Sequence, residues 1–355
     1  MNNIKKIQQE LLRQDFDAML ITGQASRLYT GGFSSSAGAY VITPQDAWFF
    51  VDARYVEAAR RNVKGAEICL VTTVDETFPE KIAKLLKEKE VKTVGFEDGI
   101  VTHATYLEWE EKFEAKLVPA QTFINDLRAI KSAQDLEGMI KAQRIAEKAF
   151  EEILPLIGNN ITERELTAEL VYRMVKNGAD DKAFDPIVVS APRSSLPHGV
   201  PTNEKIGNGF LTIDWGAKLD GWCSDCTRTL CIGKPDDEMT RVYETVYNAQ
   251  EAGINAVCGG VKCSVIDSAA RKVINDAGYG AYFGHGFGHS IGLEVHESIR
   301  CSQISEDIMP VGAVFTAEPG IYLPDRYGVR IEDTLYVTED GCKNITNLPK
   351  NLIVI

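Results

Sequence analysis

The hydrophobic positions in the first third of the chain alternate between two periodicities. Apolar residues recur at helical spacing from residue 4 to residue 12, and helices are also predicted over 54–61 and 79–88. Short apolar runs between them have the composition of buried strands; they span 18–21, 39–42, 48–51, 67–71 and 93–97. Because Pro44-Gln45-Asp46 is a turn signal, the second and third runs form a predicted hairpin. The pattern predicts a mixed-sheet α/β domain.

A second domain begins with two long helices. Ser132 has the character of an N-cap with acidic residues in the first turn, and the amphipathic pattern that follows runs to about Leu154. Thr162 and Glu165 form a capping box for the next helix. Past residue 185 the pattern changes to strands, glycines and turns. The overall class is α/β (α+β), and we place the domain boundary after residue 128, which gives domains 1–128 and 129–355.

The length and net charge of the chain limit the classes of function that it can have. A chain of 355 residues is too long for one typical core, so two domains are expected. The formal net charge of −13, with no cluster of Lys and Arg, disfavours a nucleic-acid partner. No apolar run reaches the length of a membrane span, and the N-terminus lacks the apolar stretch of a signal peptide. We therefore expect a cytoplasmic protein with no membrane and no nucleic acid as partners.

The eight cysteines are scattered, and in a chain of this kind we expect reduced thiols. Cys223 and Cys226 form a single Cys-x-x-Cys. A zinc ribbon needs a second such pair, and a redox motif needs a strand-to-helix context, which this segment lacks. We interpret both residues as plain thiols in or near a strand.

Two aspartates flank a predicted hairpin turn at Asp220-Gly221. A two-residue loop there pairs Asp214 with Thr227. Asp225 then lies on the same face as Thr227, diagonal to Asp214 and about 7–8 Å from it, which is within reach of a shared ion. A carboxylate in an apolar strand is costly to bury unless it is paired or bound to metal. Taken alone, the pair is equally compatible with two surface aspartates.

Two glutamates flank a second predicted turn. Glu318 and Glu332 are separated by 14 residues, with Asp325 at the midpoint between them. An antiparallel hairpin centred there places the two glutamates opposite each other. Like charges directly opposed destabilise a sheet, and a cation between them removes the problem. Two glutamates in exposed strands remain the alternative.

Four of the five histidines lie in the second domain. His285, His289 and His296 belong to the glycine-rich segment 283–297, where glycine permits close approach of the backbone to a ligand. The segment is neither a His-Glu-x-x-His helix nor a phosphate-binding loop. Imidazole and carboxylate suit metal binding or proton transfer, although an inert loop is the alternative. His198 lies in a turn before the first hairpin and is by itself compatible with surface or site.

Together these segments supply four carboxylates and at least one imidazole. Four carboxylates carry too much negative charge for one structural zinc ion, but they can balance two divalent ions. Oxygen-rich coordination with one imidazole favours Mn²⁺, Co²⁺ or Fe²⁺. Two such ions can activate a bridging water and polarise a carbonyl group.

The order of these motifs resembles the pita-bread metallopeptidases, which include methionine aminopeptidase, aminopeptidase P and prolidase. The shared features are the two aspartates eleven residues apart, Gly-His-x-x-Gly-Leu-x-x-His-Glu, and Glu-Pro-Gly followed by the second glutamate. The match runs over about 185–340. The preceding α/β domain is similar to the aminopeptidase P and prolidase branch. The resemblance implies a pita-bread catalytic domain over 129–355 and a creatinase/prolidase-like domain over 1–128.

The resemblance also implies roles for individual residues. It implies five metal ligands, with Asp225 and Glu332 bridging: Asp214, Asp225, His289, Glu318 and Glu332. Glu318 would also act as a base, His296 would bond the substrate near the scissile carbonyl, and His198 would be a proton shuttle or substrate contact. His285 would line the proline pocket, and Arg330 would support the second glutamate ligand.

The implied activity is hydrolysis of the Xaa-Pro bond with a bridging hydroxide as nucleophile. Two divalent ions are implied, Mn²⁺ foremost, with Co²⁺, Fe²⁺ or Zn²⁺ as alternatives, and the implied partners are a peptide with proline at its second position and a second copy in a homodimer. The loop 29–38 resembles aminopeptidase P and favours an Xaa-Pro aminopeptidase. An Xaa-Pro dipeptidase needs a cation for the free carboxylate, which Arg300 offers, and is the alternative. More remote alternatives are a metal-free creatine-hydrolase-like enzyme or a binding module, both of which predict missing ligands.

Overall fold

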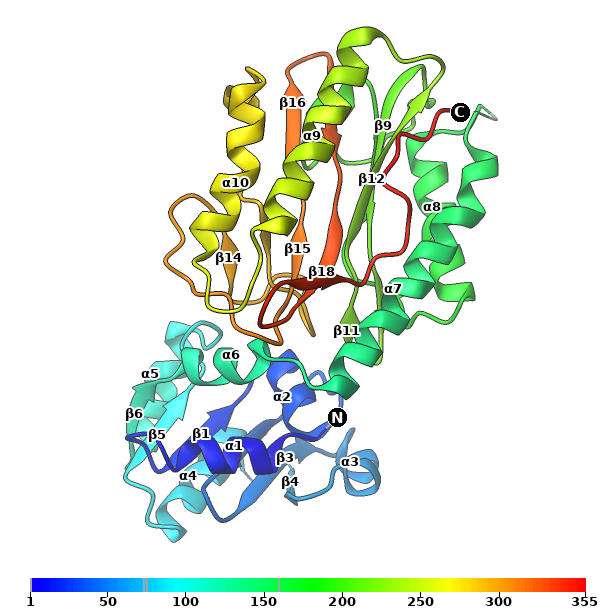
Figure 1. Ribbon diagram of the computed structural model, residues 1–355. Helices are drawn as coiled ribbons and strands as arrows, with labels where there is room; N and C mark the ends of the chain where they lie inside the picture. The colour runs from blue at the N-terminus through cyan, green and yellow to red at the C-terminus, as the bar shows by residue number, and fades with distance from the viewer. Residues whose placement is uncertain (1, 73, 75, 159) are drawn as a thin grey trace. The chain divides into compact units, whose positions relative to one another are not determined.

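The computed structural model describes residues 2–72, 74, 76–158 and 160–355. The chain divides into two compact units, Met1–Arg128 and Ala129–Ile355 (Figure 1). The first unit has its own hydrophobic core around its sheet, and the second has two large apolar clusters. Among the described residues, no helix is both long and apolar enough to span a bilayer.

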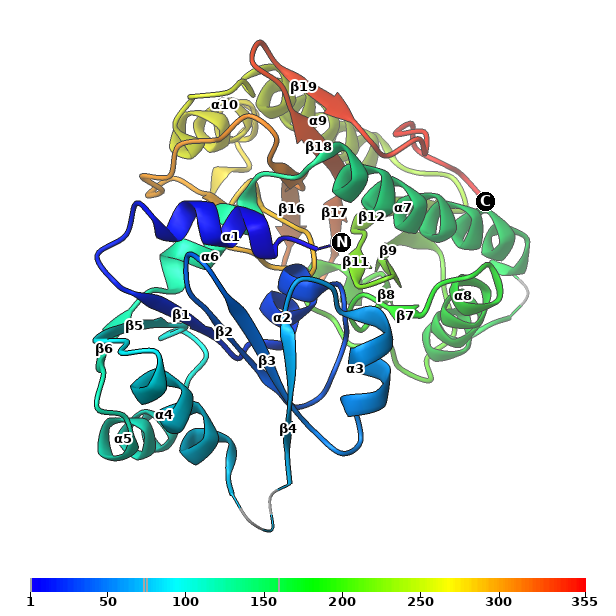
Figure 2. The ribbon, with the colours of Figure 1, turned by 90° about the horizontal axis from the view of Figure 1, so that it is seen from below.

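The N-terminal unit is built on one six-stranded mixed sheet in the order β4-β3-β2-β1-β5-β6 (Figure 2). Strand β2 pairs antiparallel with β1 and β3, whereas the outer pairs are parallel. Its strands are β1 (Ala18–Ile21), β2 (Ala39–Ile42), β3 (Ala47–Asp52), β4 (Glu67–Val71), β5 (Thr93–Phe96) and β6 (Lys116–Pro119). Its helices are α1 (Ile4–Leu11), α2 (Gln24–Gly31), α3 (Val56–Asn62), α4 (Phe78–Glu88), α5 (His103–Lys112) and α6 (Gln121–Ala129).

The predicted mixed-sheet α/β unit is confirmed, and the predicted hairpin between β2 and β3 forms with Val41 opposite Trp48. The hydrophobic pattern does not indicate α2, α5, α6 or β6. Helix α5 buries only Trp109, so it has no apolar stripe to detect. Strand β6 lies at the sheet edge, contains a proline and shows no burial alternation.

In its described residues, the second unit contains four long helices, α7 (Ala133–Ile153), α8 (Glu163–Lys176), α9 (Asp237–Asn255) and α10 (Cys263–Asp276). It also contains three short 3₁₀ turns, η1 (Leu154–Leu156), η2 (Arg193–Ser195) and η3 (Gly280–Tyr282). Ser132 caps α7 through the Asp135 amide, and Thr162 caps α8 in a capping box with Glu165. Both predicted helix starts are confirmed. Helices α7 and α8 pack on β8, β10 and β11, whereas α9 packs on β15, β16 and β17 (Figure 1).

The strands of this unit form several small sheets that meet at their edges. The sheet orders are β12-β9-β8, β11-β10-β7, β15-β18-β19, β16-β17 and β13-β14. The strands are β7 (Asp181–Lys182), β8 (Ile187–Ser190), β9 (Gly209–Trp215), β10 (Ala217–Leu219), β11 (Trp222–Cys223), β12 (Cys226–Ile232), β13 (Gly288–His289), β14 (Arg300–Cys301), β15 (Val314–Ala317), β16 (Gly320–Leu323), β17 (Tyr327–Arg330), β18 (Asp333–Val337) and β19 (Cys342–Asn344).

The first hairpin has the predicted register. Asp214 lies opposite Thr227 in the β9–β12 ladder, and the ladder β10–β11 closes on the turn at Asp220 and Gly221. Both turn residues have positive φ, 50° and 87°, as a two-residue hairpin loop requires. The turn geometry therefore determines which residues of the two strands face one another.

The second hairpin also has the predicted register. Gly320 pairs with Arg330 in β16–β17, and Ala317 pairs with Asp333 in β15–β18. The two ladders share one register across the intervening residues, which places Glu318 opposite Glu332. Asp325 adopts a positive φ of 58° at the centre of the turn.

The eight cysteines are thiols that form no disulfide bond. Cys223 lies in β11 and Cys226 begins β12, and both are buried. Their interpretation as plain thiols in a strand is confirmed. The Cys226 thiol contacts the Glu332 carbonyl at 3.6 Å.

A substitution at the first turn tests whether its backbone conformation matters for stability. We expect Gly221→Ala to lower the free energy of unfolding by about 1–2 kcal/mol, because a Cβ is disfavoured at positive φ. The matched change Gly207→Ala, at a glycine with open space around its Cβ position, should be neutral or slightly stabilising. Urea denaturation followed by circular dichroism makes the comparison, and equal midpoints for the two variants would show that the turn conformation is unimportant.

Candidate metal centre

One cavity of about 900 Å³ in the second unit brings the candidate residues together. All nine residues singled out from the sequence line it: His198, Asp214, Asp225, His285, His289, His296, Glu318, Arg330 and Glu332. They come from two hairpins, the glycine-rich loop and the turn after η2. The remaining histidine, His103, begins α5 in the other unit.

Four of these residues present ligand atoms close to one another, and a fifth, Asp214, lies diagonal to one of them on the same hairpin. Ligand atoms of Asp225, His289 and Glu332 all lie within 4.8 Å of each other. The Nε2 atom of His289 lies 3.2 Å from Glu318 Oε1 and 3.8 Å from Asp225 Oδ2. Asp214 lies diagonal to Asp225 across the first hairpin. The two carboxylate pairs therefore belong to one cluster.

The two hairpins meet along β12 and the segment 330–334. Thr227 lies opposite Glu332, where the Glu332 amide donates to the Thr227 carbonyl at 3.1 Å. On either side, side chains make the contact: Thr229 Oγ1 donates to the Arg330 carbonyl at 2.9 Å, and Thr334 Oγ1 donates to the Asp225 carbonyl at 2.8 Å. This junction places the first pair of carboxylates beside the second.

Threonine hydroxyls orient two of the glutamates. Thr227 donates to Glu332 Oε2 at 2.6 Å, and Thr316 donates to Glu318 Oε1 at 3.0 Å. Thr316 also accepts the His289 amide at 3.1 Å. A Cβ at Gly288 would lie 1.9 Å from the Thr316 carbonyl oxygen, so only glycine allows β13 to approach β15 this closely.

The orientation of His289 leaves its Nε2 atom free for an ion. The Nδ1 atom lies 3.3 Å from the Ser290 carbonyl oxygen, which can only accept a hydrogen bond. The proton of a neutral ring is therefore placed on Nδ1, and the lone pair of Nε2 points to the carboxylates. This is the tautomer that a metal ligand needs.

Arg330 connects the cluster to its surroundings. Its guanidinium donates to Asp214 Oδ2 at 2.7 Å, to Thr227 Oγ1 at 3.1 Å and to the Tyr322 hydroxyl at 2.9 Å. The other oxygen of Asp214, Oδ1, is buried and has no hydrogen-bond partner among the residues that the structure describes. A buried carboxylate oxygen of this kind requires a compensating group, and a cation supplies one.

The charges of the cluster shift its pKa values strongly. Burial, together with the neighbouring carboxylates, raises the pKa of Asp225 and that of Glu332 well above their usual values. Burial also raises the pKa of Asp214, against the opposing effect of Arg330. For Glu318, burial is outweighed by the hydrogen bond and charge that His289 supplies when both of its ring nitrogens are protonated, which lower its pKa to about 2. A ring that binds an ion through Nε2 would instead carry its one proton on Nδ1. The cluster carries more negative charge than its cations compensate.

The donor set therefore fits divalent ions. It offers four carboxylates, one imidazole that can present Nε2, and a buried carboxylate oxygen that the described residues leave unsatisfied. Ligand atoms of Asp225, His289 and Glu332 lie within 4.8 Å of one another. Oxygen donors with one nitrogen suit Mn²⁺ and similar ions. These five residues could hold two ions.

Three further histidines line the cavity around the cluster. The His285 Nδ1 atom lies 2.9 Å from the Gly286 carbonyl oxygen, and its Nε2 atom lies 3.0 Å from the Tyr322 hydroxyl. The His296 ring lies edge-on to the His289 ring, with 4.3 Å between centroids. Burial, followed by the charge of His289, lowers the pKa of His296 to about 4, so this ring is neutral near pH 7. His198 lines the same cavity with an exposed side chain.

A buried ion pair supports the loop between His289 and His296. Glu297 Oε1 accepts the Leu293 amide at 3.2 Å, and Glu297 Oε2 pairs with Lys131 Nζ at 2.6 Å. The Lys131 and Glu297 side chains are only 1% and 5% exposed. A Cβ at Gly292 would lie 2.6 Å from this carboxylate. The glycine in the motif makes room for the pair that closes the loop.

No role was predicted from the sequence for Tyr322, Thr316, Lys131 or Glu297. Tyr322 lies four residues after Glu318 on the following strand, and this spacing places both on one face. The period-2 pattern could have found it. Lys131 is 166 residues from Glu297 in the chain, and no local pattern connects them.

Comparisons with known proteins agree with this architecture. Residues 137–339 match Metallopeptidase family M24, and residues 3–130 match the Creatinase/Prolidase N-terminal domain. The chain is 36% identical to the Xaa-Pro dipeptidase of Pyrococcus furiosus, over 99% of each chain.

Two solved structures are similar over nearly the whole chain. The Xaa-Pro dipeptidase from Bacillus anthracis has a TM-score of 0.95 and 38% identity, over 99% of both chains. The X-Pro aminopeptidase from Thermotoga maritima has a TM-score of 0.91 and 34% identity, over 98% of this chain and 100% of that one. The expected fold, an N-terminal α/β domain followed by a pita-bread catalytic domain, is confirmed. The chain belongs to metallopeptidase family M24 and carries the creatinase/prolidase N-terminal domain before its catalytic unit.

Proposed function

We propose that this protein is an Xaa-Pro dipeptidase that uses two divalent metal ions. The observation that carries the proposal is the cation Arg300 in the wall of the cavity that also contains the five candidate metal ligands. The loop 29–38 favours an aminopeptidase, but the relatives named Xaa-Pro dipeptidase support the alternative better. The dipeptidase is therefore the leading assignment.

Asp214, Asp225, His289, Glu318 and Glu332 are proposed to hold the two ions, with Mn²⁺ as the expected metal. When bound, two such ions polarise a carbonyl group and lower the pKa of a bound water. The residues of the chain supply the orientation. Thr227 and Thr316 hold one oxygen each of Glu332 and Glu318, and Arg330 holds one oxygen of Asp214, which leaves the opposite carboxylate oxygens for the ions.

Proton transfer is assigned to Glu318, with His296 and His198 beside it in the cavity. Cleavage requires that a proton leave the attacking water and that one reach the departing proline nitrogen. Glu318 lies beside His289, with one oxygen already engaged by Thr316, so its carboxylate can accept the first proton and return it. His296 is neutral near pH 7 because of its lowered pKa, and as a neutral donor it can hydrogen-bond the carbonyl oxygen. His198 is proposed to contact the substrate or to transfer protons on the same cavity wall.

Proline recognition is assigned to His285. Both of its ring nitrogens are engaged by the protein, at Gly286 and Tyr322, so the ring offers the substrate its carbon surface. Burial lowers the pKa of His285, which keeps the ring uncharged. An uncharged ring held in a fixed orientation suits an apolar pyrrolidine.

Arg300 is the cation best placed to bind a free carboxylate. Arg164 and Lys182 also line the cavity, but Arg164 donates to Asn203 and Lys182 pairs with Asp185. Within the described part of the chain, the Arg300 guanidinium makes no hydrogen bond or ion pair to a side chain. Its charge contributes to the lowered pKa of His296, so it lies close to the substrate-binding histidine. A carboxylate bound there would belong to the residue after the cleaved bond.

An Xaa-Pro aminopeptidase is the second candidate. A cavity of about 900 Å³ has room beyond a dipeptide, and the Thermotoga maritima X-Pro aminopeptidase is similar over the full chain. The substrates of the two activities differ in whether proline carries a free carboxylate or is followed by another residue. A residue that binds this carboxylate, such as Arg300, therefore distinguishes the two activities.

The ligand role of Asp225 is tested by Asp225→Asn. We expect the metal content of the folded protein to fall below two ions and kcat to fall at least about 100-fold, because the variant loses one negative charge from the cluster. Inductively coupled plasma mass spectrometry and a dipeptide assay measure the two effects. The control Asp220→Asn changes the turn aspartate of the same hairpin and should alter neither. Full activity of Asp225→Asn would refute its role.

The substrate assignment is tested with Xaa-Pro dipeptides and Xaa-Pro-Yaa tripeptides on Mn²⁺-loaded protein. We expect the dipeptide to be preferred, and Arg300→Met to lower kcat/KM for it about 10- to 100-fold, since charge-assisted hydrogen bonds contribute about 1.5–3 kcal/mol. The exposed Arg326→Met, which pairs with Glu238, is the control. A preference for tripeptides that is insensitive to Arg300 would favour the aminopeptidase, and activity on neither would remove the proline-peptidase proposal.

A further inference from the structure

The buried guanidinium of Arg228 lies at the junction of the two hairpins that carry the candidate ligands, on the face opposite the cavity. Thr227 and Arg228 are adjacent in β12, so their side chains point to opposite faces of the strand. Thr227 contacts the Glu332 carboxylate on the cavity face. Arg228 lies on the other face and is only 1% exposed. The Arg228 side chain contacts none of the residues that are proposed to bind substrate or to transfer protons.

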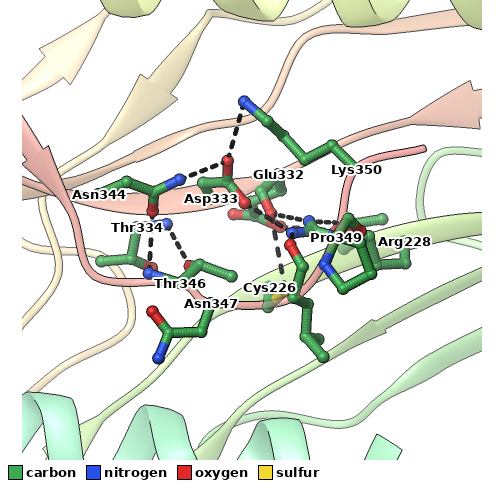
Figure 3. Close-up of polar contacts among 12 residues, drawn as sticks. Cys226, Arg228, Glu332, Asp333, Thr334, Asn344, Thr346, Asn347, Pro349 and Lys350 are labelled. Carbon is green, nitrogen blue, oxygen red and sulfur yellow. Dashed lines mark hydrogen bonds and ion pairs between the residues drawn. The ribbon is translucent and has the colours of Figure 1, made fainter. Parts of the chain in front are cut away.

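Every N–H group of Arg228 has a partner (Figure 3). Nε donates to the Pro349 carbonyl at 3.0 Å. Nη1 donates to the Thr227 carbonyl at 2.9 Å and to the Glu332 carbonyl at 2.5 Å. Nη2 donates to Asp333 Oδ1 at 2.7 Å and to the Leu348 carbonyl at 2.8 Å. A lysine offers three donors around one point and cannot reproduce this planar set.

Nη1 binds both carbonyl groups of the junction. The backbone of β12 and the segment 330–334 make one isolated bridge, between Thr227 and Glu332, in place of a continuous ladder. Because one bridge leaves the two strands free to slide or separate, other contacts must hold their spacing. Arg228 joins the same two residues from behind, while threonine side chains join the strands on the cavity side.

Groups outside the cavity hold Arg228 itself in place. The Asp333 side chain is fully buried and its second oxygen, Oδ2, accepts from Asn344 at 2.8 Å and pairs with Lys350 at 3.4 Å (Figure 3). The carbonyl groups of Leu348 and Pro349 belong to the C-terminal segment, which runs on to pair with β12 at Cys231. Asp333 and the carbonyl groups of the C-terminal segment therefore fix the position of the guanidinium. A guanidinium in a fixed position in turn fixes the two carbonyl groups of the junction to which it donates.

We propose that Arg228 is a positioning residue that sets the separation of Asp225 from Glu332, and so the affinity of the centre for its ions. The inference rests on the proposed roles of Asp225 and Glu332 as ligands. Ligand atoms of these two residues lie within 4.8 Å of each other, so a shift of the strands by a fraction of an ångström changes the fit of an ion between them. Because Arg228 does not contact the substrate cavity, its loss should change metal binding and leave substrate binding intact.

The test is Arg228→Lys, which keeps the charge beside Asp333 but loses the bonds to both junction carbonyls. Mn²⁺ binding to chelator-treated, folded protein is measured by isothermal titration calorimetry, well below the unfolding temperature. We expect affinity for the weaker ion to fall at least about 10-fold and kcat to fall at subsaturating Mn²⁺. KM for an Xaa-Pro dipeptide should stay within about twofold when Mn²⁺ is saturating.

The control is Arg144→Lys. The Arg144 guanidinium donates to the Ile345 carbonyl at 2.5 Å, in the same C-terminal segment, but contacts neither Thr227 nor Glu332. It should leave Mn²⁺ affinity unchanged even if the midpoint of thermal unfolding falls. Arg228→Lys protein that is less stable but binds Mn²⁺ with wild-type affinity would overturn the inference, because its role would then be structural only.

A second variant covers the case in which Arg228→Lys does not fold. Arg228→Met combined with Asp333→Asn removes both members of the buried pair, so no uncompensated charge remains. It should show the same weakened Mn²⁺ binding. If neither variant gives folded protein, Arg228 is required for folding and the positioning role is overturned. Absence of Mn²⁺ binding by the wild-type protein would overturn the proposed function, and the inference with it.

Discussion

The constraint on which the catalytic unit depends is the placement of four carboxylates in one buried cluster. Burial, and after it their mutual repulsion, raises the pKa values of Asp214, Asp225 and Glu332, and the nearby cations offset only part of the charge. Such an arrangement is unfavourable for a protein without ions and favourable for one that binds them. Divalent ions are the compensation that fits the donors, and the surrounding hydrogen bonds keep the carboxylates in position.

Four sets of contacts support the cluster. Threonine hydroxyls orient the glutamates within the cavity, and Arg330 joins Asp214 to Tyr322 at its side. Arg228 joins the two hairpins from behind. The buried pair of Lys131 and Glu297 closes the loop that carries two histidines. Each support uses a charged group or a hydroxyl that other groups of the protein also hold, which is how a site built from short strands keeps a defined geometry.

Much of this arrangement could be predicted from the sequence, because the turn residues of each hairpin determine its register. Asp220-Gly221 selects a two-residue loop, and the spacing around Asp325 centres the second turn, so each carboxylate pair could be placed without a structure. The helix caps at Ser132 and Thr162 were equally local. The contacts that join distant segments could not be predicted from the sequence. They are the bridge between Thr227 and Glu332, the pair of Lys131 with Glu297, and the C-terminal carbonyls around Arg228. Helix α5 and strand β6 were missed for a different reason, since they bury too little to leave a pattern.

A crystal structure of the Mn²⁺-loaded protein, with anomalous diffraction to locate the ions, is the most direct examination of the proposed centre. We predict two anomalous peaks about 3.5–4 Å apart, bound by Asp214, Asp225, His289, Glu318 and Glu332, with both ions contacted by Asp225 and Glu332. A single peak, or ions held by other residues while these carboxylates remain without metal, would contradict the dinuclear assignment.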